Sequence, residues 1–292
     1  MMAASRYRCP FVFEVRDLWP ESAVTTGVVA ADSRVVRAAE ALEATACELA
    51  DRVVAVTPAI AANLVDRGLV EPERAVVVPN GVDTSSLPVV DRAEVRRRQG
   101  WGERFVAIYA GAHGLANRLE QLIEAAHLLR HRRDILLVAV GRGPRREALM
   151  ARTRALGLDN LVWLDGVDPD EAYRLVASAN AAMVVLQDNP TFKTVYPNKM
   201  FAAMAAEVPV ILGVDGVARD LLVRARAGVP VPPESPADLA LAIGGLAADP
   251  ALCLQMGWSG RALVEEEFDR REQARKYLAM LAELVPGGGA VR

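Results

Sequence analysis

The chain has 292 residues and a net charge of −3 at pH 7, with 34 basic against 37 acidic side chains. This slightly acidic balance argues against a dedicated nucleic-acid binder, and no apolar run reaches the roughly 18 residues that a membrane-spanning helix needs. Three scattered cysteines and three histidines support neither a disulfide framework nor a zinc site, so we expect no metal and a reducing compartment.

The first eighty residues predict part of an α/β lobe. Short runs of β-branched and aromatic residues predict strands at 11–15, 53–57 and 75–79, with a helix at about 33–50. A second helix is expected from Pro58 to about Asp66, because Thr57 is a good N-cap and Gly68 lies just past the end. Three strands leave a sheet edge unpaired, which favours association with another chain.

The sequence Pro-Asn-Gly-Val-Asp at 79–83 predicts the link to a second lobe, or else a simple surface turn. Gly81 is expected to supply the backbone freedom that a tight link needs. The regions predicted are a partial lobe at 1–85, a complete lobe at 86–262 and a C-terminal region at 263–292. In the last region we expect a helix at 268–284 that crosses back to the first lobe, followed by a flexible tail.

The second half of the chain predicts a doubly wound parallel sheet. Six apolar runs, separated by helix-length segments, predict strands at 105–110, 135–140, 161–164, 181–186, 209–212 and 228–231. Leu119, Leu122, Ile123 and Ala126 repeat at helical spacing, so a helix packed on the sheet should follow the first of these strands. Ligands of such sheets bind beyond the carboxyl ends of the strands. The candidate site is therefore formed by the loops after residues 110, 141, 164 and 186.

The segment 194–211 places a lysine where a helix disfavours it. Pro197 and Asn198 predict a helix start, with the Asn198 side chain as the cap, so Lys199 falls in the first turn. A cation there opposes the helix dipole by about 0.3–1 kcal/mol, unless an anion lies against the same turn. The alternative is a solvated lysine at a fraying helix end.

Five segments resemble, in order and spacing, the motifs of glycosyltransferase family 4. They are RDLWPES (16–22), VVPNGVD (77–83), YAGAHGLANRLE (109–120), VGRGPRREAL (140–149) and YPNKMFAAMAAEVPVI (196–211). The branch that the chain looks most like builds bacterial colanic acid, capsule or O-antigen and includes fucosaminyltransferase-like enzymes. The resemblance implies an α/β, GT-B-like fold with a complete C-terminal Rossmann-like lobe. The N-terminal Rossmann-like lobe would be partial, lacking its first strands.

The resemblance also implies a donor site at the carboxyl edge of the C-terminal sheet. Arg118 and Lys199 would neutralise the donor diphosphate and stabilise the leaving group, which makes them the implied catalytic residues. The implied donor-binding residues are Gly111, Gly114, Arg146, Gly166, Val167, Thr194, Asn198 and Ala202. On the acceptor side the implied residues are Arg16, Asp17 and Glu21, which otherwise form a structural corner.

Two features beside this site have more than one interpretation. The basic run Arg142, Arg145 and Arg146 supplies a third cation for the phosphates, or it is a solvated helix start. His113, inside the glycine turn, is expected to be incidental.

Two positions depart from the family pattern. Ala202 replaces the glutamate that holds the ribose hydroxyls, which predicts nucleotide affinity weaker by about ten- to a hundred-fold. Glu207 replaces the glycine that ends the helix. Because a side chain disfavours the left-handed conformation by about 1 kcal/mol, we expect the helix to end differently here.

The activity that the resemblance implies is sugar transfer with retention at the anomeric carbon, by a hexosyl- or aminosugar glycosyltransferase. The expected donor is a nucleotide-sugar, most commonly UDP-linked, and the expected acceptor is a glycan or lipid-linked glycan of bacterial surface-polysaccharide synthesis. We expect no cofactor, and a location in the cytoplasm or at the cytoplasmic membrane face, since residues 1–9 contain no apolar signal core. The alternative is a non-catalytic nucleotide-sugar-binding module, or half of a split enzyme that needs a partner chain or self-association to complete its N-terminal lobe.

Overall fold

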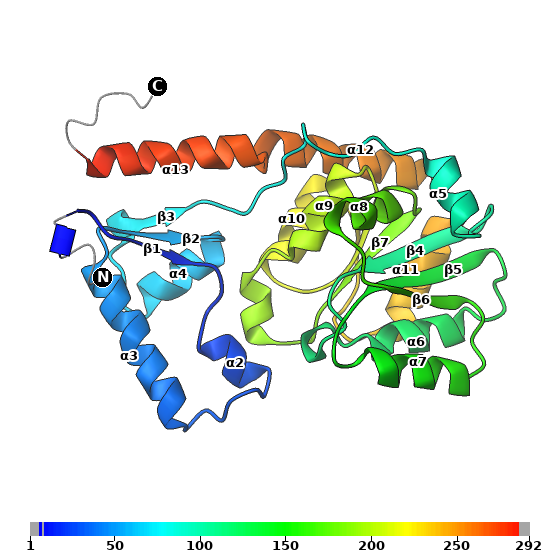
Figure 1. Cartoon of the computed structure of the whole chain (residues 1–292), viewed down its shortest axis with the longest axis horizontal. Helices are drawn as coiled ribbons and strands as arrows, with labels where there is room; N and C mark the ends of the chain where they lie inside the picture. The colour runs from blue at the N-terminus through cyan, green and yellow to red at the C-terminus, as the bar shows by residue number, and fades with distance from the viewer. Residues whose placement is uncertain (1–5, 8, 286–292) are drawn as a thin grey trace. The chain divides into compact units, whose positions relative to one another are not determined.

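The computed structural model of the chain describes residues 6, 7 and 9–285 and divides into two compact units (Figure 1). The first unit comprises Met1–Gly81, Asn189–Tyr196 and Phe268–Arg292, and the second comprises Val82–Asp188 and Pro197–Glu267. These division points lie close to the sequence boundaries at 85/86 and 262/263, but nothing in the sequence indicated that Asn189–Tyr196 groups with the first unit. The predicted flexible tail at 286–292 lies outside the described residues.

A three-stranded parallel sheet forms the centre of the first unit. Its strands follow the order β1 (Val12–Val15), β2 (Arg52–Ala55) and β3 (Ala75–Val77). Its helices are α2 (Glu21–Thr25), α3 (Arg34–Leu49), α4 (Pro58–Asp66) and α13 (Arg270–Leu284). The three predicted strands and the two predicted helices between them are confirmed, with slightly different ends.

Helices cover both faces of this small sheet. Val53 and Ala55 of β2 join the apolar cluster formed with α3 and α4. Val54, between them, packs instead with Met280 of α13, because successive side chains of a strand point to opposite faces. Figure 1 shows α13 along one side of the strands and α3 and α4 on the other. The first unit is therefore a three-layered α/β unit built on few strands.

The segment Asn189–Tyr196 is anchored to the first unit by two threonine contacts. It contains a short 3₁₀ helix, η3 (Pro190–Thr194). The hydroxyl oxygens of Thr25 and Thr191 lie 2.9 Å apart, and the Thr57 hydroxyl donates to the Thr194 carbonyl at 2.6 Å. Thr57 also caps α4 as predicted, by accepting a backbone amide in its first turn.

Gly81 is required for space, and not for the backbone freedom that the sequence suggested. Its φ angle lies outside the left-handed region, but a Cβ there would lie 2.6 Å from the Phe268 carbonyl oxygen and 3.0 Å from Arg270 Cα. The chain before α13 thus packs directly on the 79–83 segment. α13 begins at Arg270 and not at 268, because the Asp269 carboxylate accepts the Arg271 amide at 2.9 Å and caps the helix.

The second unit is built on a six-stranded parallel sheet in the order β6-β5-β4-β7-β8-β9. The strands are β4 (Phe105–Ala110), β5 (Ile135–Gly141), β6 (Leu161–Asp165), β7 (Ala181–Val185), β8 (Val210–Gly213) and β9 (Gly228–Pro230). The helices are α5 (Arg92–Arg98), α6 (Glu120–Leu128), α7 (Arg146–Ala155), α8 (Pro169–Ala177), α9 (Asn198–Ala205), α10 (Val217–Ala225), α11 (Pro236–Ala248) and α12 (Pro250–Glu267). All six predicted strands are confirmed. The strand order reverses between β4 and β7, which is the point where such sheets bind ligands.

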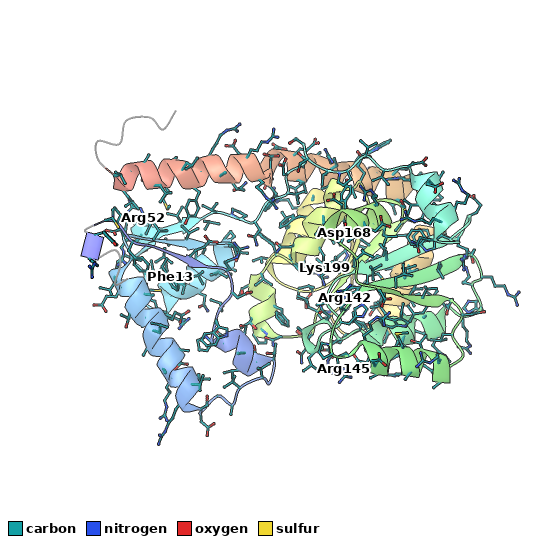
Figure 2. All side chains as sticks on the ribbon, viewed as in Figure 1. Phe13, Arg52, Arg142, Arg145, Asp168 and Lys199 are labelled. Atoms are coloured by element: carbon teal, nitrogen blue, oxygen red, sulfur yellow. The ribbon has the colours of Figure 1, made fainter. Side chains whose placement is uncertain are left out.

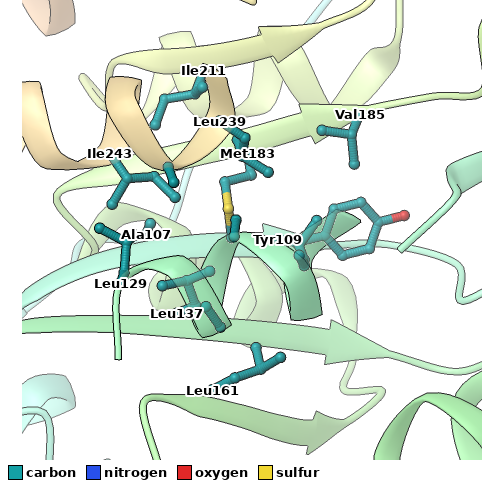
Figure 3. Close-up of a cluster of buried hydrophobic side chains, with 14 of the residues drawn as sticks. Ala107, Tyr109, Leu129, Leu137, Leu161, Met183, Val185, Ile211, Leu239 and Ile243 are labelled. Carbon is teal, nitrogen blue, oxygen red and sulfur yellow. The ribbon is translucent and has the colours of Figure 1, made fainter. Parts of the chain in front are cut away.

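The core of the second unit lies between the sheet and the layer that contains α6 and α11. Figure 3 shows strand residues such as Ala107 and Leu137 against Ile243 of α11, with the Tyr109 hydroxyl pointing away from the apolar side chains. The predicted face of α6, Leu119, Leu122, Ile123 and Ala126, is fully buried. Burial of one such leucine or isoleucine contributes about 1.5–3 kcal/mol, so this layer fixes the position of the β4 loop above it.

Both ends of α9 differ from the sequence prediction. Pro197 occupies the N-cap position without a side-chain hydrogen bond, and Asn198 is the first helical residue, so the predicted Asn198 cap is wrong. At the other end Glu207 takes the left-handed conformation, with a φ of 57°. Its amide donates to Met204, and the next amide donates to Ala203, which is the Schellman ending usually built on glycine. The helix therefore ends in the ordinary way, and the expectation of a different ending is wrong.

Candidate functional site

The turns after β4 and β5 pack backbone against backbone. Gly141 and Gly143 have φ angles of 152° and 157°, a region that favours glycine. A Cβ at Gly141 would overlap the Gly111 carbonyl oxygen, and one at Gly143 would overlap the backbone of His113. The glycines of the VGRG motif therefore allow residues 111–114 to lie against the edge of the sheet.

Lys199 lies beside this turn, in the first turn of α9. Its Nζ donates to the Tyr109 hydroxyl at 2.9 Å and lies 4.4 Å from the centroid of the Tyr109 ring. A Cβ at Gly111 would come within 3.1 Å of the same Nζ and press on the ammonium. Burial lowers the pKa of Lys199 from 10.5 to about 8 and raises the pKa of Tyr109 well above its ordinary value.

The ammonium of Lys199 has no anionic partner. The first turn of α9 contains no acidic residue, and Lys199 forms no ion pair within the described part of the chain. No side chain caps the amides of this turn either. A partly buried cation and uncapped helix amides at one place create a local excess of positive charge, and an anion bound there would balance it.

A cavity of about 960 Å³ opens beside Lys199, within the second unit. Its walls come from β4, β5, β7, α8 and α9 and are mostly apolar. The charged or tyrosine side chains that line it are Arg142, Asp168, Glu171, Tyr173 and Lys199. Three of these, Arg142, Asp168 and Lys199, are labelled in Figure 2. The volume lies at the upper end of the roughly 300–1,000 Å³ typical of ligand pockets, so a nucleotide-sized ligand fits.

The two carboxylates that line the cavity already have partners. Asp168 Oδ1 accepts the Glu171 amide at 2.9 Å and caps α8. The Glu171 carboxylate pairs with Arg98 and lies 3.7 Å from Arg174. Arg142 donates to the Gly166 carbonyl at 2.9 Å, a neutral acceptor. Glu171 is therefore ion-paired and Asp168 is stabilised at the start of α8, whereas Lys199 and Arg142 have only neutral acceptors. The cavity suits an anionic ligand with apolar parts, bound on the side of these two cations.

Five of the residues implied by the sequence line this cavity: Gly111, Gly166, Val167, Lys199 and Ala202. Gly114, Arg118, Arg146 and Asn198 are not among its lining residues, and Thr194 belongs to the first unit. The structure thus gathers the glycine turn, the 166–167 loop and the start of α9 around one cavity. The sequence analysis gave no role to Tyr109, which contacts Lys199, and left the role of Arg142, which lines the cavity, open.

Arg118 contacts an acidic residue of the second unit and is not among the residues that line the cavity. It adopts a left-handed conformation, with a φ of 45°, and its Nε lies 3.3 Å from Glu234 Oε1. The same Glu234 oxygen accepts the Asp188 amide at 3.0 Å. Glu234 itself has a φ of 54°, so two non-glycine residues in strained conformations meet at the carboxyl edge of the sheet. Nothing in the sequence pattern indicated Glu234.

The basic run after β5 divides in two. Arg142 lines the cavity, as a third cation would. Arg145 pairs with Glu120 at 2.5 Å, and Arg146 pairs with Asp165 at 2.8 Å. Figure 2 shows Arg145 away from the labelled cavity residues, towards α7. Arg142 is therefore the residue of this run that lines the cavity, and the assignment of Arg146 to the donor stays a prediction.

His113 is fully buried beneath the turn. Its ring packs edge-on against Trp163, with ring centroids 5.3 Å apart. Burial, and to a smaller extent Arg146, lowers the pKa of His113 below its ordinary value. The side chain is thus a neutral packing element under the site.

The acceptor-side residues belong to the first unit. Arg16 donates to Glu14 and to Asn80, each at 2.9 Å. Burial raises the pKa of Asp17 above its ordinary value, against the lowering effect of Arg16. Glu21 is the first residue of α2. These contacts tie β1 to the 79–83 segment, as a structural corner does.

Two searches of the described residues were negative. No group of three or more His, Cys, Asp or Glu side chains within residues 6, 7 and 9–285 is arranged to hold a metal ion. No single helix in the same part of the chain is both long and apolar enough to cross a membrane, although the bent pair α11 and α12 passes the length and composition test together.

Comparisons with known proteins identify relatives of both units. The family described as "Glycosyl transferases group 1" matches residues 91–263, and the family described as "Glycosyltransferase Family 4" matches residues 1–86. A GDP-mannose-dependent alpha-(1-6)-phosphatidylinositol monomannoside mannosyltransferase of Mycolicibacterium smegmatis is 30% identical over 220 residues, which cover 72% of this chain and 56% of the relative. A D-inositol 3-phosphate glycosyltransferase of Geodermatophilus obscurus is 32% identical over 68% of this chain and 46% of the relative. The chain spans about half the length of the curated relatives that it matches.

Solved structures show the same fold at low sequence identity. Anabaena Alr3699/HepE in complex with UDP is 18% identical, with a TM-score of 0.79 over 97% of this chain and 75% of that chain. Sucrose-phosphate synthase from Thermosynechococcus elongatus is 23% identical, with a TM-score of 0.74 over 94% of this chain and 67% of that chain. These likenesses confirm the predicted α/β, GT-B-like fold with its two Rossmann-like sheets.

Proposed function

The chain belongs to the group 1 glycosyltransferases, and we propose that it transfers a sugar from a nucleoside diphosphate donor, with retention at the anomeric carbon. The observation that carries this proposal is the ammonium of Lys199. It lies without an anionic partner at the wall of the cavity, against Gly111 and the uncapped start of α9. A diphosphate supplies the negative charge that this arrangement lacks.

Each part of the site has a role in this reaction. Lys199 and the first-turn amides of α9 bind the diphosphate, and Arg142 adds a second cation at the same cavity. Charge develops on the diphosphate as the sugar departs, so fixed donors at this place stabilise the transition state more than the bound donor. The apolar walls of the cavity hold the nucleoside and exclude water.

The identities of the donor sugar, its base and the acceptor have weaker support than the diphosphate site. The five family motifs favour a hexosyl or aminosugar donor and an acceptor of bacterial surface-polysaccharide synthesis, at the cytoplasmic membrane face. The curated relatives are named for GDP-mannose and for inositol-containing acceptors, which adds GDP to the UDP suggested by the motifs. The base therefore has to be tested with both nucleotides.

A second candidate function is a nucleotide-sugar-binding module that is not active by itself. Ala202 lines the cavity where the family pattern has a glutamate, and the sheet of the first unit has only three strands among the described residues. The first observation favours a chain that binds the donor weakly, and the unpaired edges of the small sheet favour association with another chain.

Isothermal titration of the chain with UDP, GDP and their sugars tests the proposal. We expect a binding signal with at least one nucleoside diphosphate and a much weaker one with the corresponding nucleoside, because the diphosphate adds the charged contacts with Lys199 and Arg142. Product formation with the bound donor separates the transferase from the binding module. No heat with any of these nucleotides up to millimolar concentration would overturn both candidates.

A further inference from the structure

Besides Tyr109, a second polar side chain, that of Asn117, lies beside the ammonium of Lys199. Asn117 ends the short 3₁₀ helix η2 (Leu115–Asn117), after β4, and its side chain is only 7% exposed. The orientation of its amide is assigned from the neighbouring groups: the nitrogen faces the Ala112 carbonyl at 2.8 Å, and the oxygen faces Lys199 Nζ at 3.2 Å and the Tyr109 hydroxyl at 3.1 Å. Asn117 therefore contacts the glycine turn, the tyrosine and the lysine at once.

These neighbours accept two of the three hydrogen bonds that the ammonium can donate. A lysine ammonium carries three donors. The Tyr109 hydroxyl accepts one at 2.9 Å and the Asn117 oxygen accepts another at 3.2 Å. Because Lys199 also lines the cavity, the remaining donor is available to a ligand there.

The chemistry of the two acceptors matters as much as their position. A hydroxyl and an amide oxygen orient an ammonium without cancelling its charge. A carboxylate at position 117 would form an ion pair with Lys199 and compete with any bound anion. Neutral acceptors on one side of a charged donor are what a site needs if the charge is reserved for a ligand.

We infer that Asn117 is a positioning residue for the donor diphosphate: its amide oxygen, together with the Tyr109 hydroxyl, holds the Lys199 ammonium with one N–H directed into the cavity. This inference rests on the proposed function of the cavity as a diphosphate site. Asn117 acts through Lys199 and makes no direct contact with the donor. It also fixes the Ala112 carbonyl, which couples the glycine turn to the lysine.

The test compares nucleotide affinity between pH 7 and pH 9.5 for the wild-type chain and the Asn117→Asp and Asn117→Leu variants. In the wild type, affinity should fall above about pH 8 as Lys199 loses its proton. His113, the other titratable group of the turn, is neutral throughout this range because its pKa is lowered.

We call the fall of nucleotide affinity above about pH 8 the alkaline limb of the affinity profile. The two variants should shift this limb along the pH scale in opposite directions. Asn117→Asp adds a carboxylate beside the ammonium and raises the pKa of Lys199, so the limb should shift to a pH about one unit higher. Affinity at pH 7 should fall about tenfold, because the carboxylate competes with the diphosphate for the ammonium. Asn117→Leu removes the oxygen that accepts a hydrogen bond from the charged ammonium, which lowers the pKa of Lys199. The limb should therefore shift to a lower pH than in the wild type. A merely structural asparagine would lower stability without moving the limb.

Asn160 provides the matched control. It is also buried in the second unit and donates to the Ala126 carbonyl at 2.8 Å, but it has no lysine neighbour. Asn160→Asp should cost stability and leave the alkaline limb in place. If Asn117→Asp binds nucleotide with the wild-type limb, the inference is wrong although the donor site stands. If the wild type binds no nucleotide at any pH, the inference falls together with the proposed function.

Discussion

Each unit contains a charged residue that the sequence assigned to a site, but the charge is balanced in one unit and unbalanced in the other. After β1, Arg16 is exposed and pairs with Glu14 and Asn80. At the start of α9, Lys199 is partly buried and has only neutral neighbours, Tyr109 and Asn117. An exposed ion pair costs little, whereas an unpaired buried charge is expensive unless a ligand completes it. The comparison teaches that charge balance distinguishes the ligand site from the structural corner better than the presence of basic residues does.

Lys199→Met should have the largest effect, because it removes the unbalanced charge of the second unit. Nucleotide affinity should fall about a hundredfold, because hydrogen bonds to a charged group contribute about 1.5–3 kcal/mol. The ligand-free protein should instead become more stable at pH 7. The lowering of the Lys199 pKa from 10.5 to about 8 corresponds to roughly 3 kcal/mol of destabilisation, which the variant removes.

The pH dependence of this gain has a fixed sign. The destabilisation by Lys199 is fully present below pH 8, where the folded chain holds a buried charge, and disappears as pH rises through 10.5, where both states are neutral. Chemical denaturation of Lys199→Met and of Lys276→Met, an exposed lysine of α13, measures the difference. Equal stability of the two variants at pH 7 would contradict the account.

Ala202→Glu sharpens the comparison from the opposite direction. Position 202 lines the cavity, and a carboxylate there should reach the ribose hydroxyls and tighten nucleotide binding about tenfold, since such a hydrogen bond contributes at least about 1.5 kcal/mol. Titration calorimetry measures the change. Unchanged affinity would mean that residue 202 does not face the ribose.

Gly111→Ala tests the space around the ammonium. Its Cβ would lie 3.1 Å from Lys199 Nζ, so the lysine must shift and nucleotide affinity should fall severalfold. Gly245→Ala, in α11, is the control, because no atom lies within 4 Å of a Cβ there. That variant should bind nucleotide as the wild type does and gain helix stability of up to about 1 kcal/mol.

His113→Phe is expected to have the smallest effect, and only at low pH. The folded pKa of His113 is lowered, so stability should fall as pH drops below the unfolded value of 6.5, where the unfolded chain takes up the proton first. The phenylalanine variant should lose this part of the acid sensitivity, as measured by thermal unfolding between pH 7 and pH 5. An identical acid profile for both proteins would assign the sensitivity to other groups.

Much of the second unit could be predicted because its signals are local. The six apolar runs and the spacing of Leu122 and Ile123 report burial directly, and the loops after the strands then follow from the fold class. Lys199 was identified because its conflict with the helix dipole is visible in the sequence. These predictions depend only on neighbours within one or two turns of the chain.

The rest of the site depends on contacts that no local pattern reveals. Asn117 and Lys199 are distant in sequence and meet only because β4 and α9 converge at one sheet edge. The left-handed backbone of Arg118 and its ion pair with Glu234 are likewise tertiary properties, and the assignment of Arg118 to the diphosphate stays a prediction. The ending of α9 at Glu207 was mispredicted for a related reason, since residue type alone overstates the cost of a left-handed conformation.

The central claim is that Lys199 is a partly buried ammonium without an anionic partner, at a place where an anion binds, and its titration tests this most directly. The chain has only three lysines, so the NMR signals of their side chains can be assigned one by one and the Lys199 signal followed with pH. We predict that Lys199 titrates near pH 8, below the ordinary lysine value of 10.5, and that saturating UDP or GDP raises its pKa. If Lys199 titrates at 10.5 and does not respond to either nucleotide, the account is contradicted.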